Sequence, residues 1–256
     1  MLIAIVSAMQ EEISQINQLG DAVKSEQFAG REFFHWQTAN IDFITAITQV
    51  GKVAAAQTIS ALTTRYQPDY VIVIGTAGAL HPELNIGDIV ISDKLFQHDV
   101  DLRPFRPRFE LGVVGKTFFH ADEFLAESLY QAAKNFLASV SFAKKGSELT
   151  SFGITLPKVY RGTITSGDVF FSVHYENYRQ QLQVLMPEIL ATEMEGAAIA
   201  QLCDNLQIPF SVVRFISDRA DSQAGIDFIQ FITQIAAWYG KGIIKKFFRQ
   251  LKPTAN

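Results

Sequence analysis

The sequence predicts an α/β protein with three layers, α/β/α, built around a mixed central β-sheet as a single domain over residues 1–256. Short aliphatic runs alternate along the chain with longer stretches whose apolar positions recur every three or four residues. This alternation is typical of a largely parallel sheet covered by helices on both faces. A chain of 256 residues, 48% of them hydrophobic and with no long linker, is also long enough to bury one substantial core.

Seven short runs rich in β-branched and aliphatic residues are predicted to form buried strands. In chain order they are LIAIV (2–6), FITAIT (43–48), YVIVIG (70–75), IGDIVIS (86–92), VYRGTIT (159–165), EILATEM (188–194) and FSVVRFIS (210–217). The segment FFHWQTANIDFITAI (33–47) has the pattern of a hairpin with its turn near Ala39 and Asn40. This antiparallel pair is the reason for predicting a mixed sheet.

Five longer stretches carry the apolar spacing of helices that cover a sheet. They are residues 10–19, 51–66, 121–138, 195–206 and about 226–250. Two segments, 103–120 and 144–158, lack such spacing and are predicted to be loops. No internal repeat or low-complexity tract interrupts this order.

Charge and cysteine content narrow the classes of partner. The formal net charge is −4 and the isoelectric point is about 5.7, which argues against the broad basic face that binds nucleic-acid phosphates. We therefore expect a small-molecule partner and no nucleic acid. The single cysteine, Cys203, excludes an intramolecular disulfide and a cysteine-based metal site, and we expect it to be a packing residue of its apolar helix.

Targeting and cofactor motifs are absent from the sequence. The first residues, MLIAIVSAM, lack the basic flank of a signal peptide and the length of a membrane span, so we expect a cytoplasmic protein that does not bind a membrane. The segment GTAGAL (75–80) lacks the G-x-G-x-x-G spacing of a dinucleotide site. The five histidines form no ligand pattern, so no metal and no cofactor are expected.

Chemically distinctive residues follow the first and third predicted strands, where ligands of open α/β sheets collect. Glu11 and Glu12 follow the first strand and open a helix, a position where acids usually complement the helix dipole. The small residues of GTAGAL (75–80) follow the third strand. They would let a ligand approach the backbone closely, although a tight turn needs the same residues.

Further carboxylates close the sixth and seventh strands. Glu193 and Glu195 end the run EILATEM, and Asp218 lies four residues after Arg214. A buried Arg–Glu pair would explain Arg214 and one glutamate without any function, but one cation cannot neutralise all of these acids. Because an unpaired buried carboxylate is costly, the cluster indicates a functional site at this edge of the sheet.

The motifs at these positions resemble, in order and spacing, those of the 5′-methylthioadenosine/S-adenosylhomocysteine nucleosidases, which belong to the purine nucleoside phosphorylase and uridine phosphorylase superfamily. They are SAMQEE (7–12), QVGKVAAA (49–56), GTAGAL (75–80), IGDIVISD (86–93), HDVD (98–101), TSGDVFF (165–171), ATEMEGAAIA (191–200) and VVRFISDRAD (212–221). The resemblance covers residues 1–228 and the C-terminal helix, and it implies a nucleoside phosphorylase-like fold. The chain departs from the family pattern at Gln10 and at residues 76–79, neither of which removes a catalytic position.

The resemblance implies an N-glycosyl hydrolase that cleaves 5′-methylthioadenosine and S-adenosylhomocysteine without a cofactor and works as a homodimer. Loss of the purine leaves an oxocarbenium-like sugar, so the enzyme has to protonate the base, activate water and stabilise the positive charge. By resemblance, Asp218 is the general acid at purine N7, Glu12 is the base for water, and Glu195 accepts hydrogen bonds from the ribose 2′- and 3′-hydroxyls.

The other site residues follow from the same resemblance. Those expected around the sugar, the water and Glu195 are Thr76, Ala77, Gly78, Glu193, Met194 and Arg214. Phe170 is expected to stack on the adenine, while the backbone of Phe171 and the loop at Ser217 bind its edge. Those expected around the 5′-thioalkyl arm are Met9, Val50 and Phe228, with Phe105 reaching across from a second subunit.

Three alternatives stay open at this point. A phosphorylase of the same fold would need positive charge near the sugar, for which Arg103, Arg106 and Arg108 are the one local cluster. A 6-amino-6-deoxyfutalosine hydrolase would differ only in the group at the 5′ position. A non-catalytic nucleoside-binding protein would have no need for Glu12, Glu195 and Asp218 together.

Overall fold

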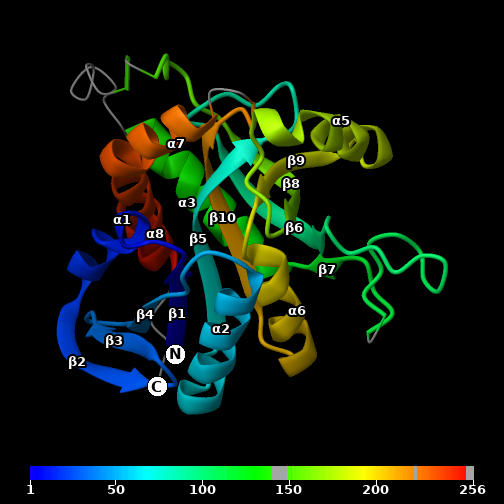
Figure 1. Ribbon diagram of the computed structural model, residues 1–256. Helices are drawn as coiled ribbons and strands as arrows, with labels where there is room; N and C mark the ends of the chain where they lie inside the picture. The colour runs from blue at the N-terminus through cyan, green and yellow to red at the C-terminus, as the bar shows by residue number, and fades with distance from the viewer. Residues whose placement is uncertain (113, 140–148, 151, 222–223, 252–256) are drawn as a thin grey trace.

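The computed structural model describes residues 1–112, 114–139, 149–150, 152–221 and 224–251, and its centre is a mixed β-sheet with helices on both faces (Figure 1). The strands are β1 (Leu2–Ser7), β2 (Asp21–Phe28), β3 (Arg31–Gln37), β4 (Asp42–Ile47), β5 (Tyr70–Ala79), β6 (Ile89–Gln97), β7 (Phe119–His120), β8 (Val159–Ser166), β9 (Ile189–Glu193) and β10 (Phe210–Asp218). The predicted α/β class with a mixed sheet is confirmed.

Part of the sheet closes on itself. Strand β5 pairs with β10, β10 with β6, β6 with β8, β8 with β9, and β9 returns to β5. The β10–β6 and β9–β5 pairs are antiparallel, and the other three pairs of the ring are parallel. From β5 the sheet continues outward as β1, β4, β3 and β2. This closure brings the ends of β5, β9 and β10 to one region, although they are far apart in the sequence.

The helices divide between the two faces. They are α1 (Gln10–Ile13), α2 (Lys52–Tyr66), α3 (Glu123–Ser139), α5 (Glu176–Leu185), α6 (Gly196–Leu206), α7 (Ala224–Phe231) and α8 (Ala237–Gln250), with a π-helical turn at Ile232–Ala236 and short 3-10 helices at Ile16–Leu19 and Val173–Tyr175. Helices α3 and α8 pack together on one face, while α2 and α6 pack together on the other (Figure 1). None of the described helices combines the length and apolarity needed to cross a bilayer.

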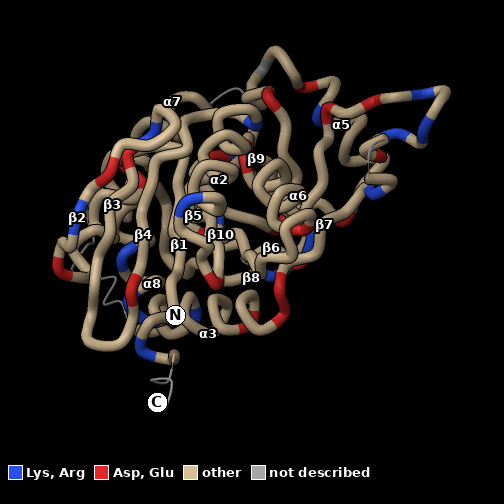
Figure 2. Tube along the Cα trace, turned by 90° about the horizontal axis from the view of Figure 1, so that it is seen from below, with Lys and Arg blue, Asp and Glu red and all other residues tan. Residues whose placement is uncertain are grey.

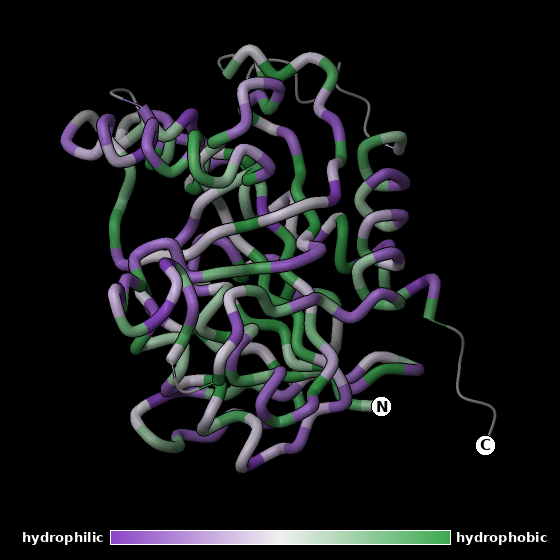
Figure 3. Tube along the Cα trace, turned by 90° about the vertical axis from the view of Figure 1, so that its right-hand side faces the viewer, coloured by the Kyte–Doolittle hydropathy of each residue, from purple (hydrophilic) through white to green (hydrophobic). Residues whose placement is uncertain are grey.

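Strand β1 illustrates why the predicted strands read as continuous apolar runs. Ile3 and Ile5 belong to the core beneath α3 and α8, whereas Ala4 and Val6 belong to the core beneath α2 and α6. Both faces of such a strand are buried, so apolar residues fill it up to its last position, where the hydroxyl of the buried Ser7 donates to Glu12. Figure 3 shows hydrophobic segments through the middle of the molecule and hydrophilic ones concentrated toward the outside.

Most predicted elements are confirmed, with shifted ends. The strand predicted at 86–92 begins only at Ile89, because Asp88 accepts the backbone N–H groups of Asn85 and Lys158 and holds Gly87 in a turn with φ of +92°. It then runs on to Gln97. The predicted hairpin is confirmed as the antiparallel pair β3–β4. The helix predicted at 10–19 is wrong as one element, since α1 and a 3-10 turn are separate.

Strand β2 and helix α5 were not predicted, and both lack the pattern of a buried face. Strand β2 pairs only with β3 at the edge of the sheet, and none of its side chains is buried. Helix α5 buries only Leu182. The loop predicted at 103–120 is largely irregular and ends in the short strand β7. Much of the loop predicted at 144–158 lies outside the described residues.

Charged residues of both signs are interspersed over the part of the chain that the structure describes (Figure 2). A cluster of Lys and Arg projects on the loop that follows β6, where Arg103 pairs with Asp101 and Arg106 with Glu110. Both arginines are exposed and are engaged by carboxylates of their own loop.

The contact between α3 and α8 gives a stability prediction. A Cβ added at Gly242 of α8 would lie 2.1 Å from the ring of Phe136, which is 4% exposed and packs edge-on against Trp238 and Tyr239. We expect Gly242→Ala to lower the free energy of unfolding by about 1–3 kcal/mol through overpacking. The control Gly225→Ala, whose Cβ meets nothing within 4 Å, should not destabilise the protein. Equal stabilities of the two variants in urea titrations would refute this packing account.

Candidate active site

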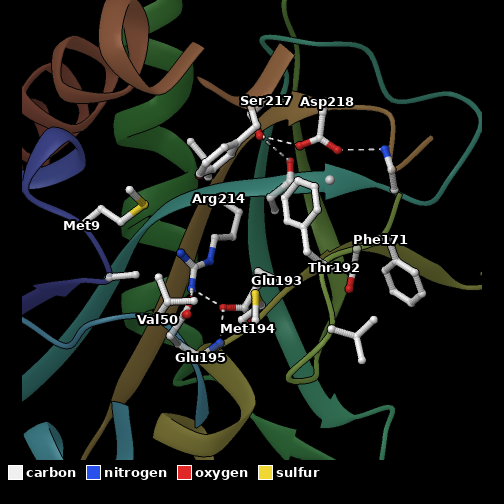
Figure 4. Close-up of a pocket in the computed structure, with 18 of the residues that line it drawn as sticks. Met9, Val50, Phe171, Thr192, Glu193, Met194, Glu195, Arg214, Ser217 and Asp218 are labelled. Atoms are coloured by element: carbon white, nitrogen blue, oxygen red, sulfur yellow. Dashed lines mark hydrogen bonds and ion pairs between the residues drawn. The ribbon is translucent and has the colours of Figure 1, made fainter. Parts of the chain in front are cut away.

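A cavity of about 420 Å³ opens where β1, β5, β9 and β10 end (Figure 4). All of the predicted site residues except Phe105 line it: Met9, Glu12, Val50, Thr76, Ala77, Gly78, Phe170, Phe171, Glu193, Met194, Glu195, Arg214, Ser217, Asp218 and Phe228. The lining also includes Ala8, Val169, Thr192 and Ala220, which the sequence did not single out. Each of these four is within two residues of a predicted one, so adjacency to the motifs was the available signal.

Glu12 lies in the first turn of α1 and is only 2% exposed. Its Oε1 accepts hydrogen bonds from the backbone N–H and the hydroxyl of Thr76, at 2.8 and 2.9 Å. Its Oε2 accepts the N–H of Met9 at 3.2 Å and the hydroxyl of Ser7. Four donors therefore replace the water that burial removes, which fixes both oxygens of the carboxylate.

Arg214 is the buried cation of the site, with 1% exposure. It pairs with Glu193, and its Nη2 lies 3.5 Å from Oε2 of Glu195. A Cβ at Gly75 would lie 2.3 Å from Nη1 of Arg214 and 2.9 Å from Oε1 of Glu12. Glycine at position 75 is therefore required by the close approach of these two side chains. The buried Arg–Glu pair that the sequence suggested is formed by Arg214 and Glu193. This pair does not account for the other buried carboxylates of the site.

Glu193 and Glu195 have different surroundings although they are two residues apart. Glu193 accepts the hydroxyl of Ser166 and the backbone N–H groups of Glu195 and Gly196, at 3.0 and 2.8 Å. Glu195 receives one N–H, from Gly51 at 2.8 Å. Burial raises the pKa of Glu195 to about 8, and the negative charge of Glu193 adds to the effect. Glu195 thus has hydrogen-bonding capacity left for a ligand.

Asp218 ends β10 on the opposite side of the cavity and is 3% exposed. The hydroxyl of Ser217 and the N–H of Ala220 each donate to it at 2.8 Å. Burial raises the pKa of Asp218 to about 6, although these two donors favour its charged form. A Cβ at Gly78 of β5 would lie 2.9 Å from Oδ1 of Asp218, so position 78 also has to be glycine. This carboxyl can hold and release a proton near neutral pH.

Aromatic side chains form the apolar wall. The ring of Phe170 is 40% exposed and meets Phe228 edge-on at 5.8 Å. Phe171 is 3% exposed, and its ring stacks on Tyr178 at 5.8 Å and lies 5.2 Å from the ring of His98. Phe170 therefore offers a free face to a planar ligand, whereas Phe171 is anchored in the neighbouring aromatic core.

Phe105 does not line the cavity of its own chain. It is 88% exposed on the loop after β6, so its predicted role depends on a second subunit. The three arginines of the same loop, Arg103, Arg106 and Arg108, also lie outside the lining. Among the described residues that line the cavity, Arg214 is the only basic one, and it is engaged by glutamates. The cavity therefore presents carboxylates and apolar surface to its ligand.

Comparisons with known proteins identify the family of this chain. The family model described as the phosphorylase superfamily matches residues 2–249. The 5′-methylthioadenosine/S-adenosylhomocysteine nucleosidases of Bacillus anthracis and Bacillus cereus are 34% identical to this chain over 98% of its length and 100% of theirs.

Solved structures give the same result. The nucleosidase of Neisseria meningitidis in complex with methylthio-immucillin-A matches with a TM-score of 0.85 and 29% identity, over 98% of this chain and 99% of that one. The nucleosidase of Colwellia psychrerythraea in complex with adenine matches with a TM-score of 0.84 and 32% identity, over 100% and 97%. The futalosine hydrolase of Helicobacter pylori matches with a TM-score of 0.80 and 28% identity, over 98% of each chain.

Proposed function

The chain belongs to the 5′-methylthioadenosine/S-adenosylhomocysteine nucleosidases of the phosphorylase superfamily, a family of N-glycosyl hydrolases, and from this premise we propose that it hydrolyses 5′-methylthioadenosine and S-adenosylhomocysteine. The products are adenine and the 5-thio-substituted ribose. The observation that carries the proposal is the meeting of Glu12, Glu195 and Asp218 in one largely apolar cavity. These are the groups that cleavage of an N-ribosidic bond requires.

Asp218 acts on the leaving base. As the bond between the anomeric carbon and N9 breaks, its electron pair moves into the purine, and Asp218 delivers a proton to N7. A pKa of about 6 supports this role, because the acid then holds a proton for an appreciable fraction of the time near neutral pH and still releases it readily. Phe170 stacks on the adenine, and the backbone of Phe171 and the loop at Ser217 bind its edge.

Glu12 acts on the nucleophile. Water attacks the anomeric carbon and gives a proton to the carboxylate of Glu12, which completes the exchange of one bond for another. Thr76 donates two hydrogen bonds to Oε1 of Glu12, so it orients the base and lies where it can also orient the sugar and water. Proton transfer to a positioned base contributes on the order of 10²- to 10⁴-fold in rate.

Glu195 binds the ribose. With a pKa of about 8 it carries a proton in the free site at neutral pH, and two hydroxyl donors together with a developing cation favour its ionised form. Binding therefore creates negative charge beside the sugar when positive charge develops on it. Glu193 and Arg214 hold Glu195 in place, and Met194 packs beneath the ribose. The 5′-thioalkyl arm lies among Met9, Val50 and Phe228.

A phosphorylase reaction fits this cavity less well than hydrolysis. Phosphate is already anionic and needs positive charge around it, but the one basic side chain of the lining is paired with glutamates. Two unit charges about 4 Å apart interact by roughly 4 kcal/mol at an effective dielectric of 20, so Glu12 would oppose a phosphate at the position of the water.

A 6-amino-6-deoxyfutalosine hydrolase activity is the second candidate, favoured by the match to the Helicobacter pylori futalosine hydrolase. The same three carboxylates would serve that reaction. The two substrates differ at the 5′ position, so the exposed residues of that wall decide between them. Val50, which belongs to that wall, is 52% exposed.

An assay of adenine release tests the proposed function. We expect release from 5′-methylthioadenosine and S-adenosylhomocysteine in phosphate-free buffer, with a free thio-substituted ribose as the second product and no acceleration by millimolar phosphate. The futalosine analogue belongs in the same panel, and a higher kcat/KM for it would assign the second candidate. A ribose 1-phosphate product, with a rate that saturates in phosphate, would identify the enzyme as a phosphorylase. Absence of adenine release from every substrate would refute the proposal.

The pH dependence tests the role of Asp218. Only protonated Asp218 is an acid, so kcat/KM should fall as pH rises through its pKa of about 6. Asp218→Asn should keep the fold, lose this descending limb and reduce kcat by about 10²- to 10⁴-fold. Asp204→Asn, at the far end of α6, is the control and should keep the wild-type profile. Near-wild-type kcat in Asp218→Asn would exclude the proton-donor role.

We also propose a homodimer in which Phe105 completes the thioalkyl pocket of the neighbouring subunit. The side chains of Phe105 and Leu102 are 88% and 43% exposed, so the described part of the chain leaves two apolar groups of this loop open to a partner. Light scattering should give twice the monomer mass, and Phe105→Ala should raise KM for 5′-methylthioadenosine. A fully active monomer at low concentration would contradict this assembly.

A further inference from the structure

Three segments far apart in the sequence meet at the rim of the cavity through one network of charged groups. Lys52 begins helix α2, Asp99 follows strand β6, and Asp168 follows strand β8. These three residues are called the rim clamp below. None of them was assigned a role by the sequence motifs, and none is needed by the proposed chemistry itself.

The rim clamp is closed by three hydrogen bonds. The ammonium of Lys52 donates to Oδ1 of Asp99 at 2.6 Å, and the N–H of Asp168 donates to Oδ2 of Asp99 at 3.0 Å. The N–H of Lys52 donates to Oδ1 of Asp168 at 2.8 Å. Each residue therefore contacts both others, and the backbone of two segments is held as well as the side chains.

A further contact ties the rim clamp to helix α6. The ammonium of Lys52 also donates to Oε1 of Gln97 at 3.0 Å, and the amide of Gln97 donates to Gln201 at 2.9 Å. Gln201 lies in α6, whose N-cap is Glu195. The start of α2 is thereby fixed relative to α6, which begins at Glu195, the carboxylate assigned to the ribose.

The peptide that the rim clamp immobilises is the one that binds Glu195. The N–H of Gly51 donates to Oε1 of Glu195 at 2.8 Å, and the next N–H in the chain, that of Lys52, is the one held by Asp168. Gly51 has a φ of +99°, and a Cβ there would lie 3.1 Å from Oδ1 of Asp168. Only glycine tolerates this backbone conformation and close approach together.

The segment that follows Ser166 is also tightly packed on the side that faces away from Gly51. A Cβ at Gly167 would lie 2.3 Å from Nε2 of His98, and the N–H of Gly167 donates to the carbonyl of Glu193 at 3.1 Å. Asp168 is therefore held between His98 and the start of α2, and a shift at Asp168 would be transmitted to Gly51.

We propose that Lys52, Asp99 and Asp168 are positioning residues that hold the N–H of Gly51 on Glu195 and so set the geometry in which the ribose hydroxyls are bound. This inference rests on the proposed function, since it assigns Glu195 to the ribose. The rim clamp touches neither the base nor the water. Its effect should therefore be confined to substrates that carry the 2′- and 3′-hydroxyls.

A cycle of two substrates and two variants tests this. The substrates are 5′-methylthioadenosine and its 2′,3′-dideoxy analogue, and the variants are Asp168→Ala and Asp168→Asn. Asp168→Ala removes the acceptor for the N–H of Lys52, whereas Asp168→Asn keeps a carbonyl oxygen there. We expect Asp168→Ala to raise KM for 5′-methylthioadenosine about five-fold with a smaller change in kcat, consistent with the loss of one neutral-donor hydrogen bond.

For the dideoxy analogue the same variant should change KM by less than about two-fold. Asp168→Asn should restore KM for 5′-methylthioadenosine to within about two-fold of wild type, since an amide oxygen accepts the same bond. Asp204→Ala, which breaks the Lys116–Asp204 surface pair at 2.7 Å, is the matched control and should leave KM for both substrates unchanged. Thermal unfolding of each variant reports whether the fold is intact.

Two results would overturn the inference. An equal rise in KM for both substrates would mean that Asp168 supports the cavity as a whole, and unchanged KM in Asp168→Ala would mean that Gly51 holds its position unaided. If Asp168→Ala does not fold, Lys52→Met replaces it, because that change breaks the pair with Asp99 without touching Asp168, and the same substrate comparison decides. Failure of wild type to cleave 5′-methylthioadenosine would instead refute the proposed function.

Discussion

The burial of Arg214 among carboxylates is the interaction on which the rest of the site depends. Its guanidinium is 1% exposed and pairs with Glu193, while Glu195 lies 3.5 Å away. Buried charges are tolerated only where they are paired and hydrogen-bonded, so the surrounding chain has to supply donors and space. Gly75 leaves space for the guanidinium of Arg214. The next residue, Thr76, donates its backbone N–H to Glu12. These requirements explain why small and hydroxyl-bearing residues form the second half of β5, whose first half is aliphatic.

The closure of part of the sheet brings these groups together. Strand β10, which carries Arg214 and Asp218, pairs with both β5 and β6, while β9, which ends at Glu193, pairs with both β5 and β8. Without the pairing of β9 with β5, strands β6 and β8 would separate β9 from β10. With the ring closed, the carboxylates at 12, 193, 195 and 218 line one cavity. The fold thus concentrates negative charge that the chain distributes over about 200 positions.

Two carboxyl groups of this cavity are buried to a similar extent but differ in pKa. Asp218 and Glu195 are both nearly inaccessible, yet their pKa values rise to about 6 and about 8. Asp218 receives two donors that favour its charged form, whereas Glu195 receives one and has the charge of Glu193 beside it. The first is suited to releasing a proton and the second to ionising when hydroxyls approach. Separate roles for two carboxylates follow from their neighbours rather than from residue type.

From the sequence alone the α/β class and the strands buried on both faces could be predicted, because two-sided burial leaves continuous apolar runs. Through the resemblance of its motifs to a known family, the sequence also identified fifteen of the residues that line the cavity. It did not determine β2 or α5, which bury almost nothing and so leave no pattern. Three features became apparent only in three dimensions: the closed ring, the choice of Glu193 as the partner of Arg214, and the joining of Lys52, Asp99 and Asp168. Such contacts depend on distances between segments far apart in the chain, and a local pattern of side chains carries no information about those distances.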